Sequence, residues 1–202
     1  MLTIDATYNN FVDFLIINSK SSEEARTFLW TKEECNKIID LHKVLTEESG
    51  TVAGEKINID MRKVVKYQIP NNTQNSWIYD KITRVILNAN SFFWNYDIDF
   101  IETVELLKYS FDPNDAVQSH YKKHSDFGAK MNKRKISYTA LLSDPVDYVG
   151  GDLTFYLEKD ITMPKEQGQI ILFPSFQFHS VSDVTQGTRW SLVTWISGRP
   201  FK

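Results

Sequence analysis

The chain has 202 residues, enough for one ordinary domain to bury a sizeable core without disulfides or structural metals. Hydrophobic residues make up 42% and charged residues 24%, values typical of globular proteins, and the aromatic share of 13% excludes a disordered chain. The formal net charge of −3 gives no reason to expect nonspecific binding to nucleic acid.

The N-terminal stretch carries no basic leader, and its apolar run Phe14 to Ile17 is too short for a signal-peptide core or a membrane span. The single cysteine, Cys35, excludes an internal disulfide framework and a cysteine-rich zinc site. We expect it to be a small apolar residue on a helix. These features predict a soluble cytoplasmic protein with one domain over residues 1–202, of which 1–27 form an N-terminal extension.

Two helices are predicted before residue 100. Residues 31–50, TKEECNKIIDLHKVLTEESG, begin with Thr31 as a possible N-cap and Glu34 three positions later, as in a capping box, and Gly50 can end the helix. In residues 77–93, WIYDKITRVILNANSFF, apolar side chains recur at spacings of three and four, which predicts a second helix. The residues of this apolar face are Ile78, Ile82, Val85, Ile86 and Ala89.

From residue 100 onward the pattern changes to short β-rich runs separated by turn residues. The runs are IETVELLKYS, KISYTALLS, GGDLTFYL, GQIILFPS and TRWSLVTWISG. Many short strands after two helices predict a sandwich or barrel with helical buttresses, with the β core at roughly residues 100–198. We find no internal repeat or linker that would divide the chain.

The stretch YKKHSDFG puts His124 and Asp126 two positions apart. If they lie on a strand, both side chains point to the same face. His179 is the only histidine after Asp126, and it follows the strand-like run GQIILFP. Two imidazoles and one carboxylate form the facial ligand set typical of non-haem Fe(II), with three coordination positions left open. An HxD triplet alone is common by chance, so the prediction depends on the combination.

Arg189 follows His179 by ten residues and is the candidate anion-binding residue. An Fe(II) site with one carboxylate is formally +1 and attracts an anionic co-substrate, whose far end Arg189 could hold. Strand alternation puts Arg189, Ser191 and Trp195 on one face. An inward guanidinium needs a buried anion to offset its desolvation. We therefore expect Ser191 near the co-substrate carboxylate and Trp195 at the pocket wall, although packing alone would also explain the tryptophan.

Other features near these residues have competing explanations. His120 and His124 share the i, i+4 spacing of helical zinc sites, but no HExxH glutamate is present and the flanking strand signals oppose a helix. We expect His120 in a loop and His42 on a helix surface. The pair Gly150 and Gly151 allows a close approach or a positive φ beside the site, and a plain hairpin turn explains it equally well.

At these residues the chain resembles the 2-oxoglutarate and Fe(II)-dependent dioxygenases, specifically the prolyl 4-hydroxylase-like branch that includes PKHD-type hydroxylases. YKKHSD is similar to the Y-x-x-H-x-D of that branch, and LLSDPVDYVGGDLTFY to its strand-turn-strand segment. FPSFQFHSVSDVTQGTRWSLVTW resembles its distal histidine and arginine block, and FLWTKEECNKIID its N-terminal helix. The likeness spans roughly residues 28–198.

The resemblance implies a double-stranded β-helix, or jelly-roll barrel, with N-terminal helices packed on one sheet. It implies that His124, Asp126 and His179 are the catalytic iron ligands. It also implies that Arg189 pairs with the distal carboxylate of 2-oxoglutarate and that Tyr109 lies near an assisting tyrosine of some relatives. The implied cofactors are Fe(II), 2-oxoglutarate as co-substrate, O2 and ascorbate.

The implied activity is hydroxylation of a C–H bond, expected on a prolyl residue of a protein or peptide, with release of succinate and CO2. Two alternatives lie within the superfamily: hydroxylation of another amino-acid side chain and demethylation of a nucleic acid. A third alternative is a non-catalytic jelly-roll binding module. Retention of the three ligands and Arg189 weighs against the module, and the acidic total weighs against nucleic acid. Nucleic acid is favoured only by a basic cluster, made of Lys122, Lys123, Lys130, Lys133, Arg134 and Lys135.

Overall fold

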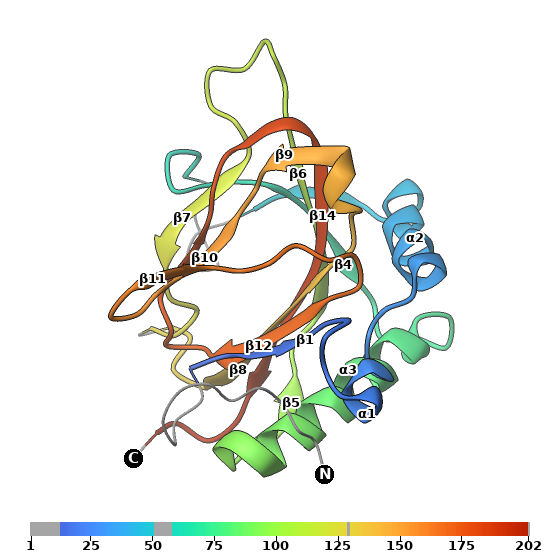
Figure 1. Ribbon diagram of the computed structural model, residues 1–202, viewed down its shortest axis with the longest axis vertical. Helices are drawn as coiled ribbons and strands as arrows, with labels where there is room; N and C mark the ends of the chain where they lie inside the picture. Colours follow the sequence, from blue (N-terminus) through green and yellow to red (C-terminus); the bar gives the residue numbers. More distant parts are fainter. Residues whose placement is uncertain (1–12, 51–57, 129, 202) are drawn as a thin grey trace.

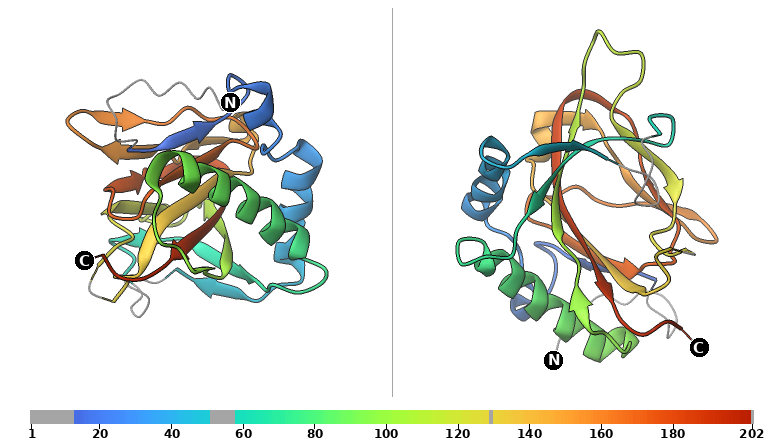
Figure 2. Two further views of the ribbon diagram at one scale, coloured as in Figure 1. Left: turned by 90° about the horizontal axis from the view of Figure 1, so that it is seen from below. Right: turned by 180° about the vertical axis from the view of Figure 1, so that it is seen from behind.

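The computed structural model describes residues 13–50, 58–128 and 130–201. Two antiparallel sheets face each other, and the helices lie on the outer side of the larger sheet (Figures 1 and 2). This arrangement confirms the predicted mainly-β jelly roll with helices packed on one sheet. The first twelve residues of the predicted N-terminal extension lie outside the described ranges, but residues 15–17 form a strand of the larger sheet.

The helix predicted to begin at Thr31 forms, and it is shorter than expected. Both hydrogen bonds of the capping box between Thr31 and Glu34 are present at the start of α2 (Lys32–Asp40). The helix ends at Asp40, not at Gly50, and a 3-10 turn (Leu41–Lys43) follows. The prediction was wrong at this end because Glu47–Ser49 pairs with another strand as β2. Cys35 lies buried in α2, as expected.

The second predicted helix, α3 (Ser76–Ala89), buries all five residues of its predicted apolar face. It continues as a π-helical turn, Asn90–Trp94. The remaining helical segments are α1 (Glu23–Arg26) and a 3-10 turn at Pro145–Asp147. None of the helices in the described ranges is long and apolar enough to cross a membrane.

The larger sheet contains most residues of four of the five predicted β-rich runs and the first residue, Gly150, of the run GGDLTFYL. Its strands follow the order β1-β12-β8-β14-β6-β4-β2, and β5 and β9 also pair with β14. The bounds are β1 (Leu15–Ile17), β2 (Glu47–Ser49), β4 (Val65–Ile69), β5 (Phe100–Ile101), β6 (Val104–Ser110), β8 (Arg134–Leu141), β9 (Tyr148–Gly150), β12 (Ile170–Pro174) and β14 (Val184–Ser197).

The smaller sheet has the order β11-β10-β13-β7-β3 and carries two of the predicted metal ligands. Its strands are β3 (Arg62–Lys63), β7 (His120–His124), β10 (Leu153–Tyr156), β11 (Asp160–Thr162) and β13 (His179–Val181). β10 is the rest of the predicted run GGDLTFYL, whereas β3, β7 and β13 are short and carry polar residues. Their places were not evident from propensity alone.

Alternation along the strands of the larger sheet divides the interior into two cores. On β6, Leu106 packs in the core shared with the helices, whereas its neighbour Leu107 packs in the core between the sheets. Ile82 of α3 belongs to the first core, and Phe155 of β10 to the second. The second core holds the candidate site, most of whose residues come from strands of the two facing sheets.

Candidate active site

The predicted ligands come together at the edge of the second core. His124, the last residue of β7, is the register partner of His179, the first residue of β13. Asp126 lies in the turn beyond β7, so the expectation that both HxD residues share a strand was wrong for the aspartate. The Ser125 hydroxyl donates to the Phe127 carbonyl oxygen at 2.7 Å within this turn. One nitrogen or oxygen from each of the three ligands lies within 4.8 Å of the others.

Each of the two imidazoles is held through its Nδ1 atom by a backbone carbonyl oxygen. The Nδ1 atom of His124 lies 2.8 Å from the Lys122 carbonyl oxygen, and that of His179 lies 3.0 Å from the Gln177 carbonyl oxygen. Donation from Nδ1 leaves Nε2 of each ring free of its proton and able to bind a metal. These Nε2 atoms lie 3.6 Å and 3.7 Å from the two carboxylate oxygens of Asp126.

The Asp126 carboxylate has its own partner. The Ser137 hydroxyl of β8 donates to Asp126 Oδ2 at 2.7 Å, and Ser175 Oγ lies 3.1 Å from Ser137 Oγ. Burial would raise the pKa of Asp126, but the two imidazoles and the Ser137 hydroxyl together hold it below its usual range. Burial lowers the pKa of His179 to about 4. A carboxylate beside a neutral imidazole is the protonation state that a metal requires.

Aromatic rings enclose the ligands on several sides. The Tyr121 ring stacks on His124 with centroids 3.4 Å apart, and Phe173 packs against His179 at 4.8 Å. Phe155 lies behind the same histidine, with 5.9 Å between ring centroids. These contacts fix the ring planes and remove water from the apolar side of the site.

Arg189 lies in the same cavity as the three ligands. It is 5% exposed, and no carboxylate in the described ranges forms an ion pair with it. Its Nη1 donates to the Ser191 hydroxyl at 3.1 Å, and its guanidinium carbon lies 5.2 Å from the ring centroid of Tyr109. Tyr109 is the register partner of Arg189, and burial raises the pKa of its phenol. Arg189 is therefore a buried cation of fixed orientation that could bind an anion in this cavity.

Trp195 lines this cavity too, at the end near Arg134. The Arg134 guanidinium lies 3.8 Å from the Trp195 ring centroid and forms a bidentate pair with Glu102. Lys135, the next residue of the basic cluster, is 3% exposed and lies over the Phe201 ring. Two members of the cluster are thus turned into the protein, which removes part of the argument for a nucleic-acid surface.

The other two histidines lie outside the ligand cluster. His120 is buried at the start of β7, so its predicted loop position was wrong. Its Nδ1 and Nε2 lie 2.8 Å and 3.1 Å from the carbonyl oxygens of Gln118 and Asp60, and it therefore joins two segments. His42 is half-buried, with its ring centroid 5.0 Å from that of Trp190.

The two glycines of YVGGDL permit close approaches. Both have positive φ, +79° at Gly150 and +62° at Gly151. A Cβ at Gly150 would lie 2.0 Å from the Asp183 carbonyl oxygen, and one at Gly151 would lie 2.7 Å from Cδ of Arg189. Gly151 therefore makes room for the arginine, which favours the close approach over a plain turn.

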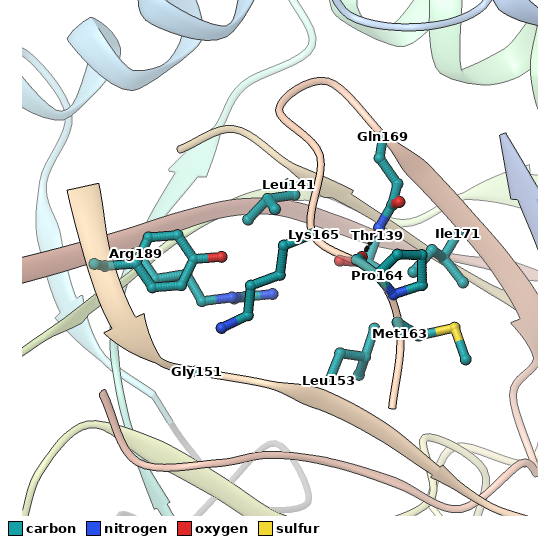
Figure 3. Close-up of a pocket in the computed structure, with 11 residues that line it drawn as sticks. Thr139, Leu141, Gly151, Leu153, Met163, Pro164, Lys165, Gln169, Ile171 and Arg189 are labelled. Carbon is teal, nitrogen blue, oxygen red and sulfur yellow. Dashed lines mark hydrogen bonds between the residues drawn. The ribbon is translucent and has the colours of Figure 1, made fainter. Parts of the chain in front are cut away.

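A second cavity is also lined by Arg189, and none of the three metal ligands belongs to its lining (Figure 3). Arg189 and Lys165 extend toward the same part of it, and Tyr148 lines its wall. Sequence reasoning did not assign Ser137, Tyr148 or Lys165. Only Tyr148 carried a signal, because it lies inside the family-like segment beside the two glycines.

Comparison with known proteins supports the assignment of this site to an oxygenase. Residues 105–197, just under half of the chain, match the family model of the 2OG-Fe(II) oxygenase superfamily. The predicted resemblance to these oxygenases is confirmed. The matching segment contains all three ligands and Arg189.

Curated relatives of this oxygenase-like chain carry the description PKHD-type hydroxylase. One from Synechococcus sp. (strain CC9902) is 45% identical over 71 residues, 34% of this chain and 31% of the relative. One from Prochlorococcus marinus is 47% identical over 64 residues, 30% of this chain and 28% of the relative. These alignments span less than a third of the relatives' lengths.

Two solved structures show the same fold over nearly the whole chain. A prolyl hydroxylase from Trichoplax adhaerens, in complex with a hypoxia inducible factor peptide fragment, has a TM-score of 0.71 at 17% identity, over 94% of this chain and 84% of that chain. A Pseudomonas putida prolyl-4-hydroxylase has a TM-score of 0.62 at 18% identity, over 86% of each chain. Identity this low shows the fold alone.

Proposed function

We propose that this protein is an Fe(II) and 2-oxoglutarate-dependent oxygenase that hydroxylates a prolyl residue of a protein or peptide. The observation that carries the proposal is a His-Asp-His cluster sharing one cavity with a buried arginine that lacks a carboxylate partner among the described residues. Ion pairing with a purely structural role would explain neither the His-Asp-His cluster nor the buried arginine. A cytoplasmic location stays a prediction from the sequence.

The donor set fits Fe(II). His124 and His179 would each offer Nε2, because their Nδ1 atoms face backbone carbonyls, and Asp126 would offer one oxygen while Ser137 holds the other. Two neutral ligands and one anion on a single face leave coordination positions open for co-substrate and O2.

The cavity fits a dicarboxylate. Arg189 presents a planar pair of donors that matches a carboxylate, and the Ser191 hydroxyl limits its rotation. With the metal, 2-oxoglutarate and O2 bound, the chemistry supplied is oxidative cleavage to succinate and CO2, coupled to hydroxylation of a substrate C–H bond. Phe155 and Phe173 keep the site dry behind His179.

A prolyl substrate is supported by the names of the similar proteins. The structural neighbours include prolyl hydroxylases, one of them solved with a peptide fragment. Hydroxylation of another side chain uses the same metal site, so the substrate must be identified by experiment.

The test incubates the protein with Fe(II), ascorbate, 2-oxoglutarate and proline-bearing peptides or a lysate, and maps added oxygen by fragmentation mass spectrometry. The expected result is a gain of one oxygen on proline together with release of succinate, both lost in Asp126→Ala. Oxygen found only on other side chains or on nucleobases would overturn the prolyl assignment. Tight 2-oxoglutarate binding with no succinate under any condition would favour the non-catalytic binding module.

A further inference from the structure

The Tyr148 hydroxyl has no hydrogen-bond partner although it is buried. Tyr148 is 5% exposed and lines the second cavity, which Arg189 also lines. Its hydroxyl is among the buried polar atoms without a hydrogen bond. Leaving such a group unpaired costs stability, so each one in a folded protein calls for a physical explanation.

The charged neighbours of this hydroxyl cannot accept its proton. The guanidinium of Arg189 and the ammonium of Lys165 carry donors only. Burial raises the pKa of Tyr148, and Arg189, which could only donate to the phenol oxygen, opposes that shift. Lys165 Nζ lies 4.9 Å from the Tyr148 ring centroid, and it is already bound by the Gly150 carbonyl oxygen at 2.6 Å and by Asp152 at 2.7 Å. Lys165 is therefore already paired, whereas the proton of Tyr148 remains available to an acceptor inside the cavity.

The backbone is shaped to keep Tyr148 beside Arg189. A Cβ at Gly151 would lie 2.7 Å from Arg189 Cδ and 3.5 Å from Cε2 of Tyr148. The glycine thus allows both side chains to occupy the same wall of the cavity. Two donors without an anionic partner among the described residues lie together there, and a carboxylate has enough acceptor sites for both.

We propose that the Tyr148 hydroxyl is a second donor, beside Arg189, to the distal carboxylate of 2-oxoglutarate, and that it sets the preference for 2-oxoacids with a second carboxylate. The inference rests on the proposed function. The rival explanation is an ordered water between Tyr148 and Gln169 Oε1, which is also buried, unpaired and in the wall of this cavity.

The experiment measures affinity by calorimetry with Mn(II)-loaded protein, so that no turnover is needed. The ligands are 2-oxoglutarate and 2-oxopentanoate, in which a methyl group replaces the distal carboxylate. For Tyr148→Phe we expect about a tenfold or greater loss of 2-oxoglutarate affinity, as for a hydrogen bond to a charged group. Affinity for 2-oxopentanoate should not change. The melting temperature should not fall, because the lost hydroxyl has no partner in the protein.

The control is Tyr156→Phe, which removes a hydroxyl bonded to Ser180 Oγ at 2.9 Å and should leave both affinities unchanged. Equal 2-oxoglutarate affinity in Tyr148→Phe and wild type would overturn the inference and favour the water. An equal loss for both ligands would also overturn it, because the hydroxyl would then act on the shared keto-acid end or on the fold. If Mn(II)-loaded wild type binds no 2-oxoglutarate, the proposed function fails first.

Discussion

Ser137 is expected to set metal affinity without touching the metal. Its hydroxyl donates to Asp126 Oδ2 at 2.7 Å, and the residue is 2% exposed, so bulk water cannot replace the bond in Ser137→Ala. Removing an outer partner of a metal ligand typically weakens metal binding about 10- to 100-fold, or about 1.4–2.8 kcal/mol. We expect a loss in this range for Mn(II), measured by calorimetry at pH 7.

A matched serine gives the control. The Ser197 hydroxyl donates to Glu102 Oε1 at 2.8 Å, and Ser197 is 1% exposed, so Ser197→Ala removes the same kind of bond to a carboxylate outside the metal cluster. Both variants should lose folding stability, measured by urea unfolding, and only Ser137→Ala should lose metal affinity. Equal Mn(II) affinity in the two variants would refute the idea that this hydroxyl orients the ligand.

Three further predictions concern the rest of the site. His124→Ala, Asp126→Ala and His179→Ala should each lose Mn(II) binding while circular dichroism shows a folded protein, and wild-type affinity in any of them would remove that residue from the ligand set. Arg189→Ala should keep Mn(II) affinity and lose 2-oxoglutarate affinity at least tenfold, with Arg189→Lys less impaired because a point charge replaces the fork; unchanged affinity in Arg189→Ala would contradict the assignment. Gly151→Ala should lower the free energy of unfolding by about 1 kcal/mol or more, because a Cβ at φ +62° is strained and meets Arg189, whereas Gly128→Ala, with no atom within 4 Å of its Cβ, should not.

The parts of the fold that sequence predicted are those with a strong local pattern. α3 repeats its apolar residues with the helical period over 14 residues, and its predicted face is buried throughout. β2, with the sequence Glu47-Glu48-Ser49, carries no apolar alternation. It forms because β4 offers a free edge, so pairing with a distant segment decided the structure and moved the end of α2.

The residues of the site likewise divide into those with a clear signal in the sequence and those without one. His124, His179 and Arg189 were evident because residue type and spacing state their chemistry. Ser137 was not, since a serine in a buried strand has no distinguishing neighbours in sequence and acquires its role only where β8 passes the turn that holds Asp126. Tyr148 depends likewise on a glycine three residues later and on a cation from a remote loop.

β14 spans 14 residues and pairs with β5, β6, β8 and β9. Because side chains alternate along it, deleting Thr188, which lies between Gly187 (the register partner of Tyr148) and Arg189, would exchange the two faces of the strand beyond that point. Trp190 would then occupy the place of the anion-binding arginine, while all four neighbouring strands could still pair. We therefore expect the number of residues in this strand to be constrained more tightly than the identity of most of them.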